Sequence, residues 1–257
     1  MAARLGKAAA VAARWSIKPK PAKINMLQKQ CALTIIMPVL NEAAFMAGAL
    51  AALAPLMDDG VEVIVVDGGS TDATVAIALA NQSPAITVVH AGSGRALQMN
   101  AGAAHANGKM LLFLHADTAL PSNADALIQQ ALASGAHVWG RFDVQIVGQS
   151  AWLPVIAALM NVRSRLTGMA TGDQAIFMTQ AAFATLKGFA AQPLMEDIEM
   201  SCRLLKLSRP ACLRQKVQTS GRRWDARGVW CTMVLMWRLR FAYWRGASPE
   251  RLAQLYR

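Results

Sequence analysis

From Cys31 onward, short apolar runs alternate with longer stretches in which apolar residues recur at helical spacing. The runs are rich in β-branched and large apolar residues, which is typical of strands, and the stretches between them have the length of helices. Strands that alternate with helices predict an α/β fold with a mostly parallel central sheet flanked by helices, and such a sheet binds ligands at the carboxyl ends of its strands. The predicted strands are Leu33–Met37, Val61–Val66, Ile86–His90 and Met110–Leu114, and the predicted helices are Glu42–Met57, Asp72–Asn81 and Arg95–Asn107.

In the second half of the chain, strand-like and helical stretches alternate less regularly, and the pattern predicts amphipathic helices at the C-terminus. In Val229–Trp244, tryptophans lie on the apolar side and arginines are interleaved with them. The other predicted elements are a helix that ends near Ser134, a strand over His137–Val147, a helix over Ala151–Leu166, a short strand over Ala175–Met178 and a helix over Glu196–Leu207.

The length of the chain fits one large α/β domain with additions or two small domains. The chain has 257 residues, of which 54% are hydrophobic and 16% charged, so a sizeable core is expected and disorder of the whole chain is excluded. Its longest apolar stretches, Ala151–Met160 and Val229–Trp237, are about half as long as a bilayer-spanning helix. We predict a flexible basic tail over residues 1–30, an α/β domain over 31–224, and a helical extension over 225–257 that packs on the domain or on a membrane surface.

Charge is unevenly distributed along the chain. Residues 1–30 carry a net charge of +7, residues 31–200 of −7 and residues 201–257 of +11. Basic ends suit a nucleic acid, an anionic membrane surface or a polyphosphate substrate, whereas an acidic centre suits metal chemistry better than DNA binding. The tail is too basic for a secretory signal and the four cysteines have no zinc or redox spacing, so a cytoplasmic protein with reduced thiols is expected.

Polar motifs follow the first two predicted strands. Pro38-Val39-Leu40-Asn41-Glu42 closes the first, and Asp67-Gly68-Gly69-Ser70-Thr71-Asp72 closes the second. A carboxylate at the strand tip, Asp67, can accept a hydrogen bond from a base N–H or a ribose hydroxyl, and the glycines after it let the backbone approach a ligand closely. An ordinary strand-to-helix turn capped by Ser70 or Asp72 explains the second motif equally well.

Two further motifs carry groups suited to a diphosphate. Asp117, in Phe113-Leu114-His115-Ala116-Asp117-Thr118, offers the hard oxygen that a divalent cation prefers. Gly92-Ser93-Gly94-Arg95 offers backbone amides and a guanidinium to phosphate. Each motif also has a structural interpretation, the first as a cap before Pro121 and the second as a plain turn.

An acidic and a cationic cluster lie nearer the C-terminus. Glu196-Asp197-Ile198-Glu199 places three acids in the first turn of a helix, where the helix dipole favours them and where one of them can act as a general base. Gly221-Arg222-Arg223-Trp224 follows a strand and suits a diphosphate, or forms a solvated basic patch.

Taken together, these segments resemble glycosyltransferase family 2, the inverting enzymes of the GT-A fold, over about Leu33 to Arg257. Leu33–Glu42, Val65–Thr74 and Asn100-Ala101-Gly102 are similar to the family's opening strand and turn, its Val-Val-Asp-x-Gly-Ser-Thr-Asp-x-Thr segment and its Asn-x-Gly. Where the family has an Asp-x-Asp metal motif, this chain has His115-Ala116-Asp117. The Phe-Leu-His-Ala-Asp-Thr form looks like one bacterial subgroup of the family.

The resemblance implies a metal-assisted transfer of a sugar, with inversion, from a nucleotide-diphosphate-sugar to a hydroxyl acceptor. Asp197 would be the catalytic base, and Asp117, with His115 beside it, would hold Mg²⁺ or Mn²⁺ on the diphosphate. Asp173, Gln174 and Glu196 would face the sugar or the acceptor, and the nucleotide and its diphosphate would contact Pro38, Leu40, Glu42, Asp67, Gly69, Arg95, Arg222, Arg223 and Trp224.

Two alternatives stay open. A nucleotidyltransferase shares the architecture and the metal, although it normally has a Gly-rich, Lys-containing loop where this chain has Val39-Leu40-Asn41-Glu42. A non-catalytic module that docks on membranes through its C-terminal helix is the other. If the protein is a transferase and its C-terminal helix lies in a membrane interface, we expect a lipid-linked acceptor and a location at the inner face of the membrane. No nucleic-acid partner is expected.

Overall fold

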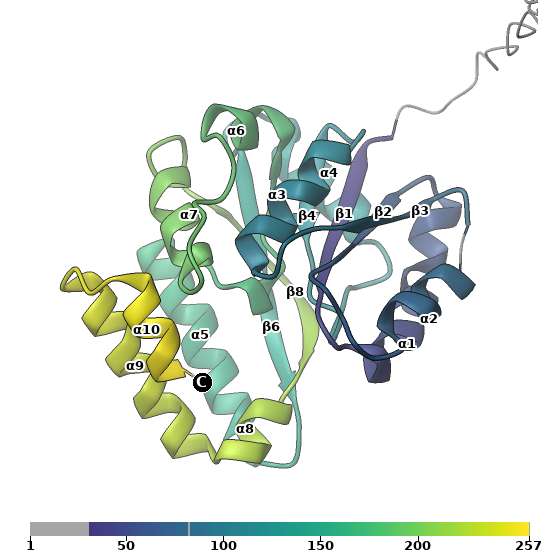
Figure 1. The fold of residues 1–257 in the computed structure, drawn as a ribbon. Coiled ribbons are helices and arrows are strands. Elements are labelled where there is room, and N and C mark those ends of the chain that lie inside the picture. Colours follow the sequence, from purple (N-terminus) through teal and green to yellow (C-terminus); the bar gives the residue numbers. More distant parts are fainter. Residues whose placement is uncertain (1–30, 82, 257) are drawn as a thin grey trace, which may run out of the picture.

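One eight-stranded sheet runs through residues 31–81 and 83–256, the part of the chain that the computed structural model describes (Figure 1). The predicted tail over residues 1–30 lies outside these residues. The strands are β1 (Leu33–Val39), β2 (Glu62–Asp67), β3 (Ile86–His90), β4 (Met110–Phe113), β5 (Thr118–Ala119), β6 (Trp139–Val147), β7 (Phe177–Thr179) and β8 (Ala211–Ser220).

The order of the strands is β3-β2-β1-β4-β7-β6-β8-β5. β1 pairs in parallel with β2 and β4, β2 pairs in parallel with β3, and so does β6 with β8. β7 is antiparallel to both β4 and β6, and β5 is antiparallel to β8. The predicted α/β fold with a mostly parallel sheet is therefore confirmed.

Helices cover both faces of the sheet because its central strands are apolar on both sides. On one face, Ile35 belongs to a core that includes Leu50 of α1 and Ile128 of α4. On the other face, Ile36 belongs to a core that includes Met99 of α3. The helices are α1 (Ala43–Asp58), α2 (Thr74–Ala80), α3 (Arg95–His105), α4 (Ala124–Ala133), α5 (Leu153–Thr167), α6 (Gln180–Thr185), α7 (Glu196–Leu204), α8 (Arg222–Arg227), α9 (Val229–Trp244) and α10 (Pro249–Tyr256).

The second half of the chain departs from the predicted elements more than the first. The strand expected over Ala175–Met178 begins at Phe177, because a turn at Gly172–Gln174 and a positive φ of 48° at Ala175 delay it. The strand expected from His137 begins at Trp139. The two-residue strand β5 has no hydrophobic period from which it could be predicted.

The C-terminal helices α9 and α10 pack on the loop before α7 through Met195, Leu239 and Leu252. Two tryptophans of α9 are largely exposed, Trp237 at 61% and Trp244 at 78%. The exposed side of α9 is an outer surface of the protein, whereas its other side faces a cavity described below, and Trp237 also contributes to the lining of that cavity. None of the described helices is both long and apolar enough to span a bilayer.

Candidate active site

The Asp67 carboxylate stabilises the turn that follows β2. Its side chain is almost fully buried and accepts hydrogen bonds from the main-chain N–H groups of Gly69 (3.0 Å) and Ser70 (3.1 Å), and His90 Nδ1 lies 3.4 Å away. Burial acts to raise the pKa of Asp67, but the bonds from Ser70, Gly69 and His90 outweigh it and hold the pKa below its usual value. Gly69 has a positive φ of 95°, which a glycine adopts without strain.

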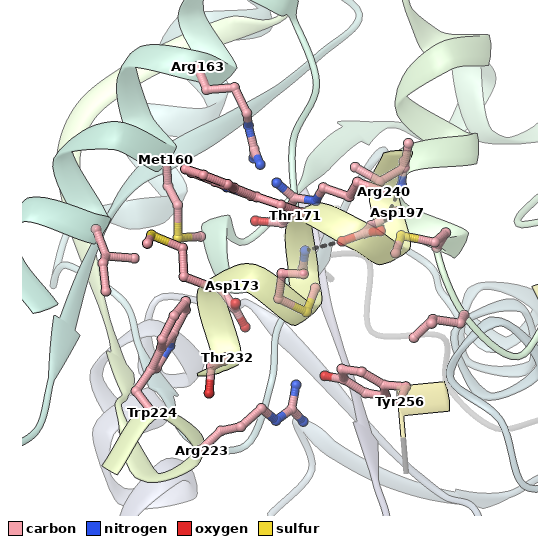
Figure 2. Close-up of a pocket in the computed structure, with 18 of the residues that line it drawn as sticks. Met160, Arg163, Thr171, Asp173, Asp197, Arg223, Trp224, Thr232, Arg240 and Tyr256 are labelled. Carbon is pink, nitrogen blue, oxygen red and sulfur yellow. Dashed lines mark hydrogen bonds between the residues drawn. The ribbon is translucent and has the colours of Figure 1, made fainter. Parts of the chain in front are cut away.

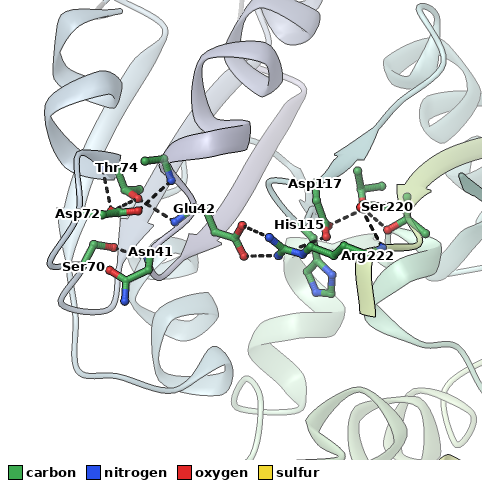
Figure 3. Close-up of polar contacts among 12 residues, drawn as sticks. Asn41, Glu42, Ser70, Asp72, Thr74, His115, Asp117, Ser220 and Arg222 are labelled. Atoms are coloured by element: carbon green, nitrogen blue, oxygen red, sulfur yellow. Dashed lines mark hydrogen bonds and ion pairs between the residues drawn. The ribbon is translucent and has the colours of Figure 1, made fainter. Parts of the chain in front are cut away.

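A second set of bonds joins the turn after β2 to the turn after β1 (Figure 3). Asn41 N–H donates to Ser70 Oγ (2.9 Å), and Thr71 N–H donates back to Asn41 Oδ1 (2.8 Å). Glu42 N–H donates to Thr74 Oγ1 (2.8 Å). The polar residues of both motifs therefore fix the two loops at the carboxyl ends of β1 and β2 against each other.

Glu42, Arg222 and Asp117 form an ion cluster that bridges distant parts of the sequence (Figure 3). Arg222 donates to both carboxylate oxygens of Glu42, at 2.9 and 2.6 Å, and lies 3.4 Å from Asp117 Oδ2. Its guanidinium also lies over the Phe45 ring, 4.6 Å from the centroid. These contacts bring the start of α8 to the carboxyl ends of the central strands.

A cleft of about 370 Å³ opens at these strand ends. Gln98 forms part of its floor and connects β1 to β2, because its amide donates to the carbonyls of Val39 (2.8 Å) and Val66 (2.9 Å). The predicted site residues that line the cleft are Pro38, Leu40, Glu42, Arg95, His115, Asp117, Asp173, Glu196, Arg222, Arg223 and Trp224.

The short turn at Gly172–Gln174 presents Asp173 to this cleft. His115 Nδ1 lies 3.4 Å from the Asp173 carboxylate. Burial opposes ionisation of Asp173, but His115, together with the charges of Arg95 and Arg223, holds its pKa below the usual value. Gln174 is fully buried and donates to Asn161 Oδ1 (3.3 Å), so it anchors the turn from beneath.

Glu196 and Asp197 are adjacent acids at the start of α7. Asp197 accepts hydrogen bonds from the main-chain N–H groups of Gly172 (3.0 Å) and Ile198 (2.7 Å). Burial, followed by the negative charge of Asp173, raises the pKa of Asp197 despite these bonds. Burial, followed by the charge of Asp197, raises the pKa of Glu196, which is 7% exposed. Raised pKa values are typical of carboxylates that exchange protons.

A second cavity, of about 490 Å³, lies under α9 and opens against the same acids (Figure 2). Its wall is largely apolar and comes from α5, α7, α9 and α10. The cleft and the cavity meet at residues that line both, namely Arg95, His115, Asp173, Leu194, Glu196, Arg223, Trp224 and Tyr256. Asp197 lines the cavity and not the cleft.

The structure thus brings together most of the predicted site residues, but not all. Asp67 and Gly69 shape the turn beside the cleft without lining it, and Gln174 is buried behind Asp173. The roles predicted for them toward a nucleoside or a sugar stay predictions. Arg163 and Arg240, which line the cavity, were not predicted as site residues.

Comparisons with known proteins identify the family and the fold. A sequence model of glycosyl transferase family 2 matches residues 34–192, well over half of the chain. A PGL/p-HBAD biosynthesis glycosyltransferase of Mycobacterium tuberculosis (strain ATCC 25618 / H37Rv) is 37% identical over 108 residues, and the match covers 40% of this chain and 42% of that protein. The chain therefore matches less than half the length of this relative.

Two solved structures with similar folds are distant in sequence. S. aureus TarS in complex with UDP superposes with a TM-score of 0.61 at 17% identity, over 74% of this chain and 60% of that one. The mannosyltransferase PcManGT from Pyrobaculum calidifontis, in complex with GDP-Man and Mn²⁺, has a TM-score of 0.59 at 21% identity, over 89% and 70%. At these identities the likeness establishes the fold.

Proposed function

Because the chain belongs to glycosyl transferase family 2, we propose that it transfers a sugar from a nucleoside-diphosphate-sugar to a hydroxyl group of an acceptor, with inversion. The observation that carries the proposal is the meeting of two compartments at one group of charged residues. A polar cleft at the strand ends suits the donor, and a largely apolar cavity suits the acceptor. Asp173 and Glu196 line both, so a sugar in the cleft and a hydroxyl in the cavity would meet beside them.

The cleft supports donor binding through its cations. Arg95, Arg222 and Arg223 reach it from two distant segments, and guanidinium groups suit phosphate oxygens. Glu42 holds Arg222 in place. Two solved structures of this fold contain UDP and GDP-Man, which fits a nucleoside diphosphate at this edge of the sheet.

Asp117 and His115 suit a divalent cation that is also bound by the diphosphate of the donor. In the described part of the chain, no three His, Cys, Asp or Glu side chains are grouped so as to hold a metal unaided. Mg²⁺, however, is commonly bound by one or two carboxylates plus substrate phosphates, and both side chains line the cleft. When bound there, Mg²⁺ or Mn²⁺ would neutralise charge on the departing diphosphate.

Asp197 is the proposed base. Its two main-chain hydrogen bonds fix the carboxylate at the cavity, where an acceptor hydroxyl would lie. The acceptor oxygen forms a bond to the anomeric carbon as the bond from that carbon to the diphosphate breaks. The diphosphate leaves with the electron pair, and Asp197 takes the hydroxyl proton. Its raised pKa brings the base closer to the pH at which proton transfer is efficient.

Membrane contact is proposed for the outer surface of α5 and α9. Exposed apolar side chains recur along both helices, and Trp152 contacts Trp230 across them with ring centroids 5.2 Å apart. The surface also carries exposed Arg238 and Arg245, which suit anionic lipid headgroups. The members of this α5–α9 surface are Trp152, Val155, Leu159, Val162, Leu166, Trp230, Val234, Trp237, Phe241 and Trp244.

The test is a donor screen that measures release of UDP or GDP from a panel of nucleotide sugars, with Mg²⁺, Mn²⁺ or EDTA. We expect one nucleotide class to be hydrolysed slowly without acceptor and faster with hydroxyl-bearing acceptors. Cleavage between the two phosphates or at the α-phosphate would instead support the nucleotidyltransferase alternative. If no nucleoside diphosphate shifts the melting temperature with or without metal, both enzyme proposals fail and the non-catalytic module is favoured.

A further inference from the structure

Resting on the proposed function, we propose that the acceptor is an amphipathic alcohol that carries an anionic group, and that Arg163 and Arg240 bind this group. The two arginines lie on different helices, Arg163 on α5 and Arg240 on α9. Figure 2 shows both side chains directed into the cavity under α9.

The two guanidinium groups have buried donors without partners. Nε and Nη2 of Arg163 and Nε of Arg240 are inaccessible to solvent and make no hydrogen bond to any described residue. A buried donor left unpaired costs about 1–3 kcal/mol, and more when it is charged. Carboxylate and phosphate oxygens pair well with guanidinium groups, and both arginine side chains line the cavity in which such an anion would lie.

Nearby acids do not serve as partners for Arg163. Asp197 attracts Arg163 electrostatically, but its oxygens accept from the main-chain N–H groups of Gly172 and Ile198. By contrast, Arg223, another guanidinium in this cavity, stacks on the Tyr256 ring at 4.9 Å, and it also lines the donor cleft. Arg163 and Arg240 do not line the cleft, which separates them from the proposed diphosphate site.

The rest of the cavity wall suits an apolar skeleton. Met160, Met233, Met236 and Trp237 line the same cavity as the two arginines and the acids. Methionine and aromatic side chains adapt to the shape of an apolar ligand. A volume of about 490 Å³ is within the usual range for a small organic ligand. An acceptor whose anionic end binds the arginines can thus place a hydroxyl at Asp197.

The experiment compares matched acceptors in the nucleotide-release assay. Each alcohol is supplied as a free carboxylate, a phosphate and a neutral methyl ester or amide, once as a soluble aryl compound and once as a long-chain amphiphile in phosphatidylcholine vesicles. We expect the anionic form to have a KM at least tenfold lower than its neutral analogue. The soluble and vesicle arms show whether the anion belongs to a free small molecule or to a lipid.

Arg163→Met and Arg240→Met should each raise the KM of the anionic acceptor about tenfold or more, without changing the KM of the neutral one or donor binding. Arg251→Met, an exposed position on α10 that lines neither the cavity nor the cleft, is the control. Equal KM values for acid and ester in the wild-type protein would overturn the inference. Calorimetry measures binding of the anionic compounds to the wild type and to Arg163→Met independently of turnover. Failure of this inference is therefore distinguishable from failure of the proposed transferase activity.

Discussion

Asp197 and Glu196 are neighbours in sequence, but their surroundings give them different expected roles. Replacing Asp197 by Asn keeps the shape of the side chain and removes the base, so turnover should fall about 10²–10⁴-fold. Donor affinity should stay close to the wild-type value, because Asp197 does not line the donor cleft. Steady-state nucleotide release and calorimetric donor titration measure the two quantities.

Glu196→Gln provides the matched comparison for that experiment. Glu196 lines both the cleft and the cavity, so its loss is expected to change donor and acceptor KM values as well as turnover. If Asp197→Asn retains full activity while Glu196→Gln loses turnover, the base is Glu196.

The shifted carboxyl pKa values predict opposite pH trends in stability for two variants. The pKa of Glu196 is raised in the folded state, so this group favours folding most below its unfolded pKa and loses that contribution as the pH rises through the folded pKa. The pKa of Asp67 is lowered, so its contribution is present above its unfolded pKa and is lost as the pH falls through the folded pKa.

Glu196→Gln should therefore gain stability relative to the wild type as the pH rises from about 4 to 8, whereas Asp67→Asn should lose it as the pH rises from about 2 to 5. Thermal unfolding from about pH 2 to 8, without ligands, measures both differences. Parallel trends for the two variants would contradict the assigned directions.

Sequence patterns locate the residues at strand ends better than those on helix interiors. Asp117, Glu42 and Arg222 lie in recognisable motifs, and all three meet in one ion cluster. Arg163 and Arg240 lie in helices with strongly apolar sequences, and no motif marks them. Helical spacing would have indicated Arg163, because it follows Ile156 and Met160 at intervals of four and three and so shares their inner face.

At the scale of elements, the packing of α3 on the sheet depends on a glycine. A Cβ on Gly102 would lie 2.5 Å from Ile36 Cγ2 and 2.9 Å from Val66 Cγ2. Gly102→Ala should therefore destabilise the fold by about 1–3 kcal/mol through overpacking, although alanine is the better helix former. Because α3 carries Arg95 and Gln98, donor affinity should also fall. Chemical denaturation and donor titration measure the two effects.

Gly48→Ala is the matched control, since Gly48 is exposed in the middle of α1 and a Cβ there would meet nothing within 4 Å. It should stabilise the protein by about 0.5–1 kcal/mol. Equal effects of the two substitutions would show that helix propensity alone governs both positions.

Of the four strands predicted in the first half, β1, β2 and β4 are buried apolar runs and β3 is rich in β-branched residues, and helices connect the four strands along the sequence. β1 continues through Pro38 to Val39, because it pairs with β2 as far as Asp67. No run of β-branched residues predicts this extension. The face of α9 that packs inward was not predictable in the same way. Apolar residues occur on all its sides, so the choice of inner face depends on contacts such as Leu239 with the loop before α7.

At the scale of the whole molecule, the α5–α9 surface belongs to the same two helices that line the cavity proposed for the acceptor, and Leu159 and Trp237 contribute to both. A protein that exposes a large apolar patch commonly uses it for binding, and here the patch lies next to the compartment proposed for an amphipathic acceptor. Membrane docking through this surface would therefore place the cavity near the lipid headgroups, where an acceptor with an apolar body concentrates.

This arrangement predicts that the wild-type protein floats with vesicles that contain anionic lipid, and that a double variant, Phe241→Ser with Trp244→Ser, loses about tenfold or more in partitioning. The two side chains are 60% and 78% exposed and do not line the cavity, and burying a large apolar side chain contributes roughly 1.5–3 kcal/mol. Leu79→Ser, a change of an exposed leucine on α2, is the control and should float as the wild type does. Activity toward a soluble acceptor should survive in the double variant, whereas activity toward a vesicle-bound acceptor should fall with partitioning. Flotation that is unchanged in the double variant would exclude this surface as the membrane contact.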